Sequence, residues 1–156
     1  MLFHPKNRRI PVIYLCFTGF FCYFAVMKVI VSPDSFKECM ASRQVAAALG
    51  AAARECWPGA DVLEIPLADG GEGTLDVLAD AMGASMHQAR VHDPLGRPVQ
   101  ARYATLGDIA IIEVAQAIGL SLLKQEERAP LLASSQGVGE LMLAAYGQGC
   151  RRFIIG

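Results

Sequence analysis

Short apolar runs and longer segments of helical periodicity alternate along the first part of the chain. Residues 28–32 and 62–65 are short, apolar and rich in β-branched side chains, which is typical of buried strands. Between them the pattern predicts a helix from Ser42, the expected N-cap, to about Trp57. The expected buried stripe of that helix comprises Val45, Leu49, Ala52 and Cys56. Strand, helix and strand in this order predict a parallel sheet.

A second helix is predicted after a glycine-rich stretch at residues 66–76. Apolar residues there follow the i, i+3, i+4, i+7 pattern of an amphipathic helix, and Gly83 is placed to end it as a C-terminal cap. The expected apolar stripe comprises Leu75, Leu78, Ala79 and Met82. Residues 27–84 are therefore predicted to be the N-terminal part of a first α/β domain with a parallel, Rossmann-like sheet.

The pattern changes to an antiparallel style near residue 85. Two strands are predicted around the turn "DPLG", and a third, apolar strand covers residues 109–115. A helix over residues 137–149 and a final strand from residue 151 follow. That helix is expected to turn Val138, Leu141 and Ala145 to one face. We predict that residues 85–156 begin a second, mixed α/β domain that is incomplete where the chain stops.

The first 26 residues differ from the rest in composition. They contain three basic residues, no acidic residue and seven of the twelve aromatic side chains, and residues 10–26 are largely apolar. Such a head resembles a signal peptide or a short membrane anchor. The alternative, which we favour, is a spurious extension ahead of a start at Met27, where "MKVIVS" begins a strand.

The overall composition excludes several classes of function. The net charge is −1 and nothing in the chain is basic enough for nucleic acid, so no nucleic-acid partner is expected. A membrane partner is expected only if the apolar head is a real part of the protein. The five cysteines include no C-x-x-C pair, which favours a reduced, cytoplasmic protein with incidental thiols.

Two loops carry the most unusual local chemistry. The stretch "PLADGGEGTLD" follows one predicted strand and "PDSFK" follows its parallel neighbour. Both loops should leave the same edge of the sheet, where ligands of open α/β sheets bind. Together they supply carboxylates, hydroxyls, an amine and backbone N–H groups. The residues concerned are Asp34, Ser35, Lys37, Asp69, Gly70, Gly71, Glu72, Gly73 and Thr74.

Two interpretations of the glycine-rich stretch stay open on the pattern alone. The glycines and the start of the second helix could bind a phosphate balanced by Lys37, while Asp69 or Glu72 could bind Mg2+. Alternatively, the glycines only turn a strand into a helix that the two acids cap. Glu113 lies on an apolar predicted strand and is either a paired structural acid or a site residue, because burial of an unpaired carboxylate is costly.

Six segments in order carry a resemblance to a known family. They are "VSPDSFKE", "PLADGGEGT", "DPLGRPV", "IIEVAQAIGL", "ERAPLLASSQGVGEL" and "FIIG". In content, order and spacing they resemble the bacterial glycerate kinase family over residues 27–156. The resemblance implies a two-domain α/β kinase that uses ATP and Mg2+ to phosphorylate D-glycerate at its 2-hydroxyl, giving 2-phosphoglycerate.

The resemblance also implies roles for individual residues. The expected catalytic residues are Lys37, Asp69 and Glu72. The expected substrate- and phosphate-binding residues are Asp34, Ser35, Gly70, Gly71, Gly73, Thr74, Glu113, Arg128, Ser134 and Ser135. Neither a catalytic base nor a metal ligand is assigned among them.

The chain departs from the family pattern in sequence and in length. Gln116 and Ile118 replace a small residue and a serine, Ala129 replaces an asparagine, and Val138 replaces a hydroxyl residue. Family members are more than twice as long. We therefore expect an N-terminal fragment that is inactive alone and whose partner is the missing C-terminal half of the kinase. The alternatives are a non-enzymatic gene remnant and a membrane-tethered binding domain.

Overall fold

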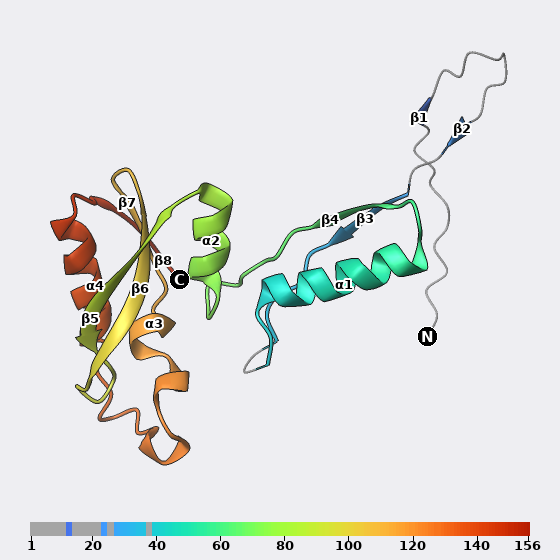
Figure 1. The fold of residues 1–156 in the computed structure, drawn as a ribbon. Helices are drawn as coiled ribbons and strands as arrows, with labels where there is room; N and C mark the ends of the chain where they lie inside the picture. Colours follow the sequence, from blue (N-terminus) through green and yellow to red (C-terminus); the bar gives the residue numbers. More distant parts are fainter. Residues whose placement is uncertain (1–11, 14–22, 25–26, 37–38) are drawn as a thin grey trace.

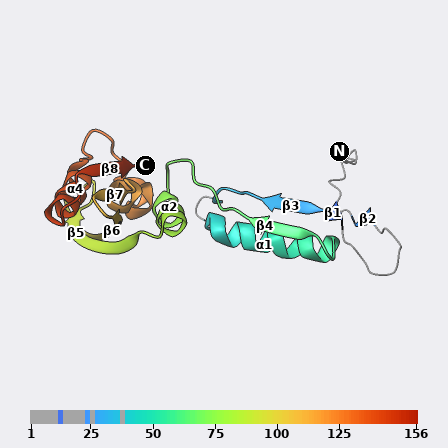
Figure 2. The same ribbon diagram turned by 90° about the horizontal axis from the view of Figure 1, so that it is seen from above.

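The computed structural model describes residues 12–13, 23–24, 27–36 and 39–156. Its main elements form two units joined by an extended segment (Figures 1 and 2). Most of the apolar head lies outside the described residues, so the choice among signal peptide, anchor and extension stays a prediction. Within the head, the short strands β1 (Val12–Ile13) and β2 (Tyr23–Phe24) pair antiparallel. Among the described ranges, no helix is both long and apolar enough to cross a bilayer.

The first unit contains the predicted parallel pair of strands. Strands β3 (Lys28–Val31) and β4 (Asp61–Glu64) run side by side in parallel. The pairing continues past the end of β4, where the N–H of Ile65 donates to the carbonyl of Val31 at 2.8 Å. The loops that follow the two strands therefore leave the same edge, as the sequence predicts.

The helix α1 (Ser42–Cys56) packs on these strands through small side chains. Its buried residues are Ser42, Val45, Ala46, Gly50 and Ala53. The predicted stripe is wrong beyond Val45: Leu49, Ala52 and Cys56 are exposed. The helix lies close to β4, since a Cβ on Gly50 would meet the carboxylate of Glu64 and this side chain would have to move.

The N-terminus of α1 also differs from the prediction. The N-cap residue is Ala41, with an extended backbone, and Ser42 is the first residue of the helix. The side chain of Gln44 accepts the N–H of Ala41 at 3.2 Å. A glutamine three residues into the helix therefore satisfies the backbone here, rather than a serine hydroxyl.

The second unit is a four-stranded sheet covered by helices on both faces (Figure 1). The spatial order is β5–β6–β7–β8, in which β8 pairs parallel to β7 and the other neighbours are antiparallel. The strands are β5 (Ser85–His92), β6 (Pro98–Leu106), β7 (Ile109–Ile112) and β8 (Arg152–Ile155). The helical segments are α2 (Thr74–Met82), α3 (Ala115–Ile118), η1 (Leu120–Leu122), η2 (Gln125–Glu127) and α4 (Gln136–Gly147).

Side-chain alternation along β6 and β7 divides the core of this unit into two layers. On one face, Ala104 and Ile111 pack against the helix α2. On the other face, β5, β6 and β7 pack against α3 and α4. The larger cluster consists of Val91, Ala101, Tyr103, Ala110, Ile112, Ala117, Leu141, Ala145 and Cys150. The predicted apolar stripes of α2 and α4 are confirmed, as is the cap at Gly83, which has a φ of +66°.

The mixed α/β class is thus confirmed: beside the short antiparallel pair β1–β2, the described residues form a parallel pair of strands and a mixed four-stranded sheet. Helix α2, which the sequence analysis places in the first domain, packs against β6 and β7. The predicted domain boundary near residue 85 stays a prediction. Strand β7 ends earlier than expected, at Ile112, so Glu113 lies directly after the strand rather than within it.

We expect Leu141→Ala to lower the free energy of unfolding by about 2–5 kcal/mol, because it would empty a fully buried position between α4 and the sheet. Leu143→Ala is the matched control on the same helix. Leu143 is 70% exposed, so its truncation should change stability by less than about 0.5 kcal/mol. Urea denaturation followed by circular dichroism measures both, and equal losses would contradict the assignment of the two helix faces.

Candidate functional site

The candidate site begins where β3 ends. Asp34 and Ser35 follow this strand, and Asp34 Oδ1 accepts the N–H of Ser35 at 2.7 Å. The hydroxyl of Ser32 donates to the carbonyl of Ile65 at 3.0 Å, which ties the loop after β3 to the end of β4. Lys37 lies outside the described residues, so its catalytic role stays a prediction.

The glycine-rich loop, residues 66–73, leads from β4 into α2. Gly70 and Gly73 have φ values of +97° and +95°, in the left-handed region that favours glycine. Asp69 Oδ1 accepts the N–H of Gly71 at 2.9 Å and stabilises the turn. Asp69 and Glu72 both remain exposed. The glycines are therefore needed to make the turn, and the turn presents two carboxylates to solvent.

Glu113 is buried, with 1% of its surface exposed, directly after β7. Its Oε2 accepts the N–H of Gly73 at 3.0 Å and the N–H of Leu75 at 2.9 Å. Its Oε1 accepts Nε2 of Gln116 at 3.1 Å. These donors and the positive end of the α2 dipole compensate for burial of the carboxylate. Two N–H groups that the sequence analysis offered to a phosphate are thus donated to a carboxylate of the protein itself.

These contacts make Glu113 a paired structural acid, one of the two roles that the sequence left open. Its predicted contact with substrate stays a prediction. The sequence contains one usable signal, a charged residue within an apolar run. It gave no signal for the partners, because Gly73 precedes Glu113 by forty residues.

Thr74 brings an unpaired hydroxyl to the start of α2. The residue is 6% exposed, and its Oγ1 is the one buried side-chain polar atom without a hydrogen-bond partner in the described part of the chain. Gly156, directly after β8, packs against the same turn: a Cβ there would lie 3.0 Å from the carbonyl oxygen of Gly70. An unsatisfied buried hydroxyl costs about 1–3 kcal/mol, so Thr74 is a candidate contact for a ligand oxygen.

Arg128, Ser134 and Ser135 form their own local contacts in the second unit. Ser134 donates its N–H to the carbonyl of Pro94 at 2.9 Å, and Ser135 is the N-cap residue of α4. Nη2 of Arg128 lies 3.5 Å from the carbonyl oxygen of Leu120. Among the described residues, no hydrogen bond or ion pair joins these three to the loop. The structure therefore joins the loop to Glu113 by direct hydrogen bonds, whereas this second group of predicted binding residues contacts other segments.

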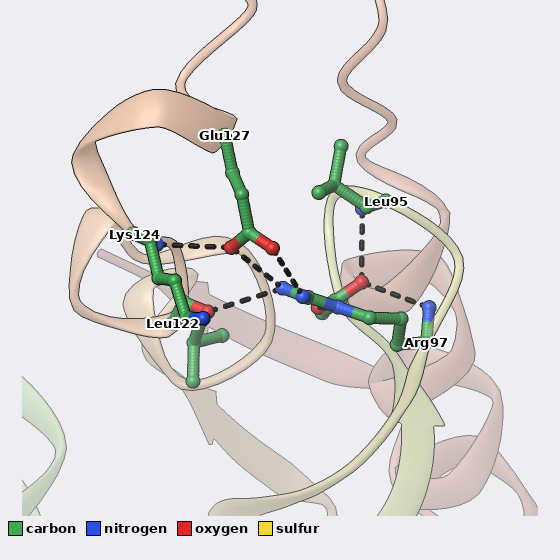
Figure 3. A network of polar contacts seen from close by, with 6 residues as sticks. Leu95, Arg97, Leu122, Lys124 and Glu127 are labelled. Atoms are coloured by element: carbon green, nitrogen blue, oxygen red, sulfur yellow. Dashed lines mark hydrogen bonds and ion pairs between the residues drawn. The ribbon is translucent and has the colours of Figure 1, made fainter.

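A polar network holds the segment next to Arg128 (Figure 3). Buried Asp93 accepts the N–H of Leu95 at 2.9 Å, the N–H of Arg97 at 2.8 Å and Nε of Arg97 at 2.6 Å. Arg97 continues to Glu127, with Nη1 donating to Oε1 at 2.8 Å. The network joins the β5–β6 turn to η2. The sequence pattern predicts this turn but not the network, although an acid and an arginine four residues apart are a local signal for it.

The network changes the acidity of its carboxyl groups. Burial alone would raise the pKa of Asp93, but the hydrogen bonds and charge of Arg97, with the N–H of Leu95, outweigh it, and the pKa lies below its ordinary value. Hydrogen bonds from the N–H of Lys124 and from Arg97 likewise lower the pKa of Glu127. Both groups are therefore ionised at neutral pH.

A third polar contact fixes the start of α4. Glu140 accepts the N–H of His92 at 2.7 Å and lies 2.8 Å from Nδ1 of the same residue. A Cβ on Gly137 would collide with the backbone carbonyl of His92, so this glycine allows α4 to approach β5. Two of the departures from the family pattern, Ile118 and Val138, are partly buried against the larger core, so apolar side chains suit both positions.

The fold and these loops define an α/β protein whose candidate ligand groups gather beyond the ends of parallel strands and at a helix start. A sequence profile described as the glycerate kinase family matches residues 29–156. The chain belongs to the glycerate kinase family.

Individual relatives agree with this assignment. The chain is 43% identical over 132 residues to a glycerate kinase of Bacillus subtilis (strain 168) and 42% identical over 132 residues to a glycerate 2-kinase of Escherichia coli (strain K12). Each match covers 83% of this chain and 35% of the relative. A crystal structure described as a glycerate kinase 2 from Salmonella typhimurium LT2 matches with a TM-score of 0.66 and 41% identity, over 84% of this chain and 36% of that chain. The chain thus spans about a third of the length of the relatives it matches.

We expect Asp93→Asn to destabilise the protein by about 1–3 kcal/mol at pH 7, because the amide keeps an acceptor but loses the charge that pairs with Arg97. The folded-state pKa of Asp93 is lowered, so its stabilisation is present above the ordinary value of 3.8 and is lost as the pH falls through the folded-state pKa. The difference between variant and parent should therefore shrink below about pH 4.

Urea denaturation at several pH values measures this difference. Asp61→Asn is the control, because Asp61 forms an exposed ion pair with Lys28 that should contribute less than about 1 kcal/mol. A difference for Asp93→Asn that does not change with pH would contradict the electrostatic account.

Proposed function

We propose that this chain is part of a glycerate kinase and that its loops after β3 and β4 form one wall of the active site. The supporting observation is the family match over residues 29–156, which includes both loops. In the proposed reaction, the γ-phosphoryl group of ATP passes to the 2-hydroxyl of D-glycerate, giving ADP and 2-phosphoglycerate. The named relatives are a glycerate kinase and a glycerate 2-kinase.

The loop carboxylates fit a Mg2+ ion shared with nucleotide phosphates. Mg2+ in such sites takes one or two carboxylates and completes its shell with phosphate oxygens and water. The exposed carboxylates of Asp69 and Glu72 offer that donor set. In the described ranges, no three His, Cys, Asp or Glu side chains gather to hold a metal, so the phosphates would be needed to complete the site. When bound, Mg2+ and ATP supply the phosphoryl group and neutralise charge during its transfer.

The other residues of the loops would bind and orient the substrates. The buried, unpaired hydroxyl of Thr74 would gain a partner from a ligand oxygen. Gly70 and Gly71 allow a ligand to approach the backbone closely. We place Lys37 beside a phosphate, and Asp34 and Ser35 beside glycerate. Because phosphoryl transfer requires little covalent chemistry from the protein, positioning and electrostatics would provide most of the catalysis.

The rest of the active site would come from the part of the relatives that lies beyond the matched third. Exposed apolar side chains of the first unit support a contact of this kind. A groove of about 450 Å³ runs between β3 and α1, and exposed Ile30, Leu49 and Trp57 are among the residues that line it. Arg128, Ser134 and Ser135 are proposed as binding residues of such a completed enzyme.

A chimera tests the proposed reaction directly. Residues 27–156 would replace the matched segment of the Bacillus subtilis glycerate kinase. We expect ATP consumption that depends on D-glycerate, with 2-phosphoglycerate identified by phosphorus NMR. Glu72→Gln should lower kcat/KM at least about tenfold, because it removes one proposed Mg2+ ligand. Glu126→Gln, an exposed acid outside both loops, should retain the rate. A folded chimera without glycerate-dependent ATP consumption would contradict the proposed function.

The 156-residue chain alone is expected to show no turnover. It spans about a third of the relatives that it matches, so the groups that the remaining two thirds would supply to the site are missing from it. A coupled assay for ADP with D-glycerate measures this, with the active chimera as the positive control. Turnover above the enzyme-free background would show that the loops of this chain suffice, and would overturn the expectation of a required partner.

A further inference from the structure

A ring of polar contacts begins and ends on the first turn of α2. Asp76, on that turn, forms a bidentate ion pair with Arg102 of β6, with both N–O distances 2.9 Å. Arg102 Nε donates to Oε1 of Gln116 at 3.3 Å, and Nε2 of Gln116 donates to Oε1 of Glu113 at 3.1 Å. Glu113 then closes the ring on the backbone at the start of the same helix. Three separate parts of the sequence thus meet at the glycine-rich loop.

The carboxylate of Glu113 occupies the place that an external anion would take at this helix start. Its Oε2 holds the N–H groups of both Gly73 and Leu75, and the residue is almost completely buried. Charge-assisted hydrogen bonds of this kind are roughly twice as strong as those between neutral groups. A ligand phosphate would have to displace Glu113 to reach the same two N–H groups.

Gln116 has a side-chain chemistry that suits its place in the ring. Its amide must accept from a guanidinium and donate to a carboxylate, and a neutral amide does both at once. The backbone N–H of Gln116 also donates to the carbonyl of Glu113 at 3.1 Å, which fixes the spacing of the two residues. Arg102 is anchored in turn by its two hydrogen bonds to Asp76. These hydrogen bonds raise the pKa of Arg102; partial burial opposes the shift, and the charges of Asp76 and Glu113 add to it.

We propose that Glu113 is a positioning residue for the glycine-rich loop and that Gln116 sets the orientation of its carboxylate. The loop carries Asp69 and Glu72, so the ring fixes where these carboxylates stand relative to the sheet. The placement of the loop is independent of the reaction. Only the effect on phosphoryl transfer rests on the proposed function.

Amide proton NMR of the 156-residue chain tests the placement. Gln116→Met preserves the length of the side chain and removes both hydrogen-bonding groups. We expect hydrogen exchange at Gly73 and Leu75 to accelerate at least fivefold, and their amide proton signals to move upfield. Glu113→Gln keeps a carbonyl acceptor but loses the charge, so its effect on the same signals should be larger. Gln148→Met, at the exposed end of α4, is the matched control.

The pattern of the changes separates positioning from a general loss of stability. A merely structural role would accelerate exchange along the whole of α2, including Ala79 in its core, and would lower the urea midpoint in proportion. Positioning changes Gly73 and Leu75 while Ala79 keeps its protection. Unchanged signals at Gly73 and Leu75 in both variants, or a uniform acceleration along α2, would overturn the proposal.

The same substitutions in the chimera test the effect on the reaction. Gln116→Met is expected to lower kcat about tenfold and to change the KM for D-glycerate less than threefold, because the loop is misplaced but not removed. If the NMR signals change and the chimera has no kinase activity even without the substitution, the placement stands and the proposed function fails. If the signals change and kcat does not, the link from loop placement to phosphoryl transfer is overturned.

Discussion

The arrangement of the second unit depends on one buried carboxylate. Glu113 stands at the end of a central strand and accepts the first N–H groups of α2, so the helix start, the glycine-rich loop and the sheet meet at a single side chain. Leaving a buried donor or acceptor without its partner typically costs about 1–3 kcal/mol, and more where a charged group is involved. The loop can therefore be rich in glycine and still hold a defined position.

This constraint changes the meaning of the glycine-rich stretch. The turn and the ligand loop, which the pattern offers as alternatives, are compatible in the structure. Gly70 and Gly73 make the turn through their positive φ values, while Asp69 and Glu72 remain exposed on it. The first N–H groups of α2 donate to Glu113. The groups left for a ligand are therefore the carboxylates of Asp69 and Glu72 and the hydroxyl of Thr74.

The two units differ in how completely they bury their apolar side chains. The sheet of the second unit has helices on both faces and fully buried residues such as Tyr103 and Leu141. The first unit has two strands and one helix, and leaves Ile30 and Trp57 exposed beside its groove. The second unit also exposes apolar side chains, among them Leu131, Leu132 and Leu143, so both units of this chain carry apolar surface that is not covered.

The sequence by itself determined the order of the main strands and helices from β3 to β8, though not α3 and the two short 3-10 helices, and it determined the parallel exit of the two loops and the buried faces of α2 and α4. Those features follow from periodicity within short segments, which the chain expresses locally. Only the tertiary structure decided which face of α1 is buried and what Glu113 binds. Gly50 of α1 lies against Glu64 of β4. Glu113 accepts the N–H of Gly73, which lies forty residues earlier in the chain. Contacts between distant segments leave no periodic trace, so the partner of a buried acid becomes visible only when the segments are packed together.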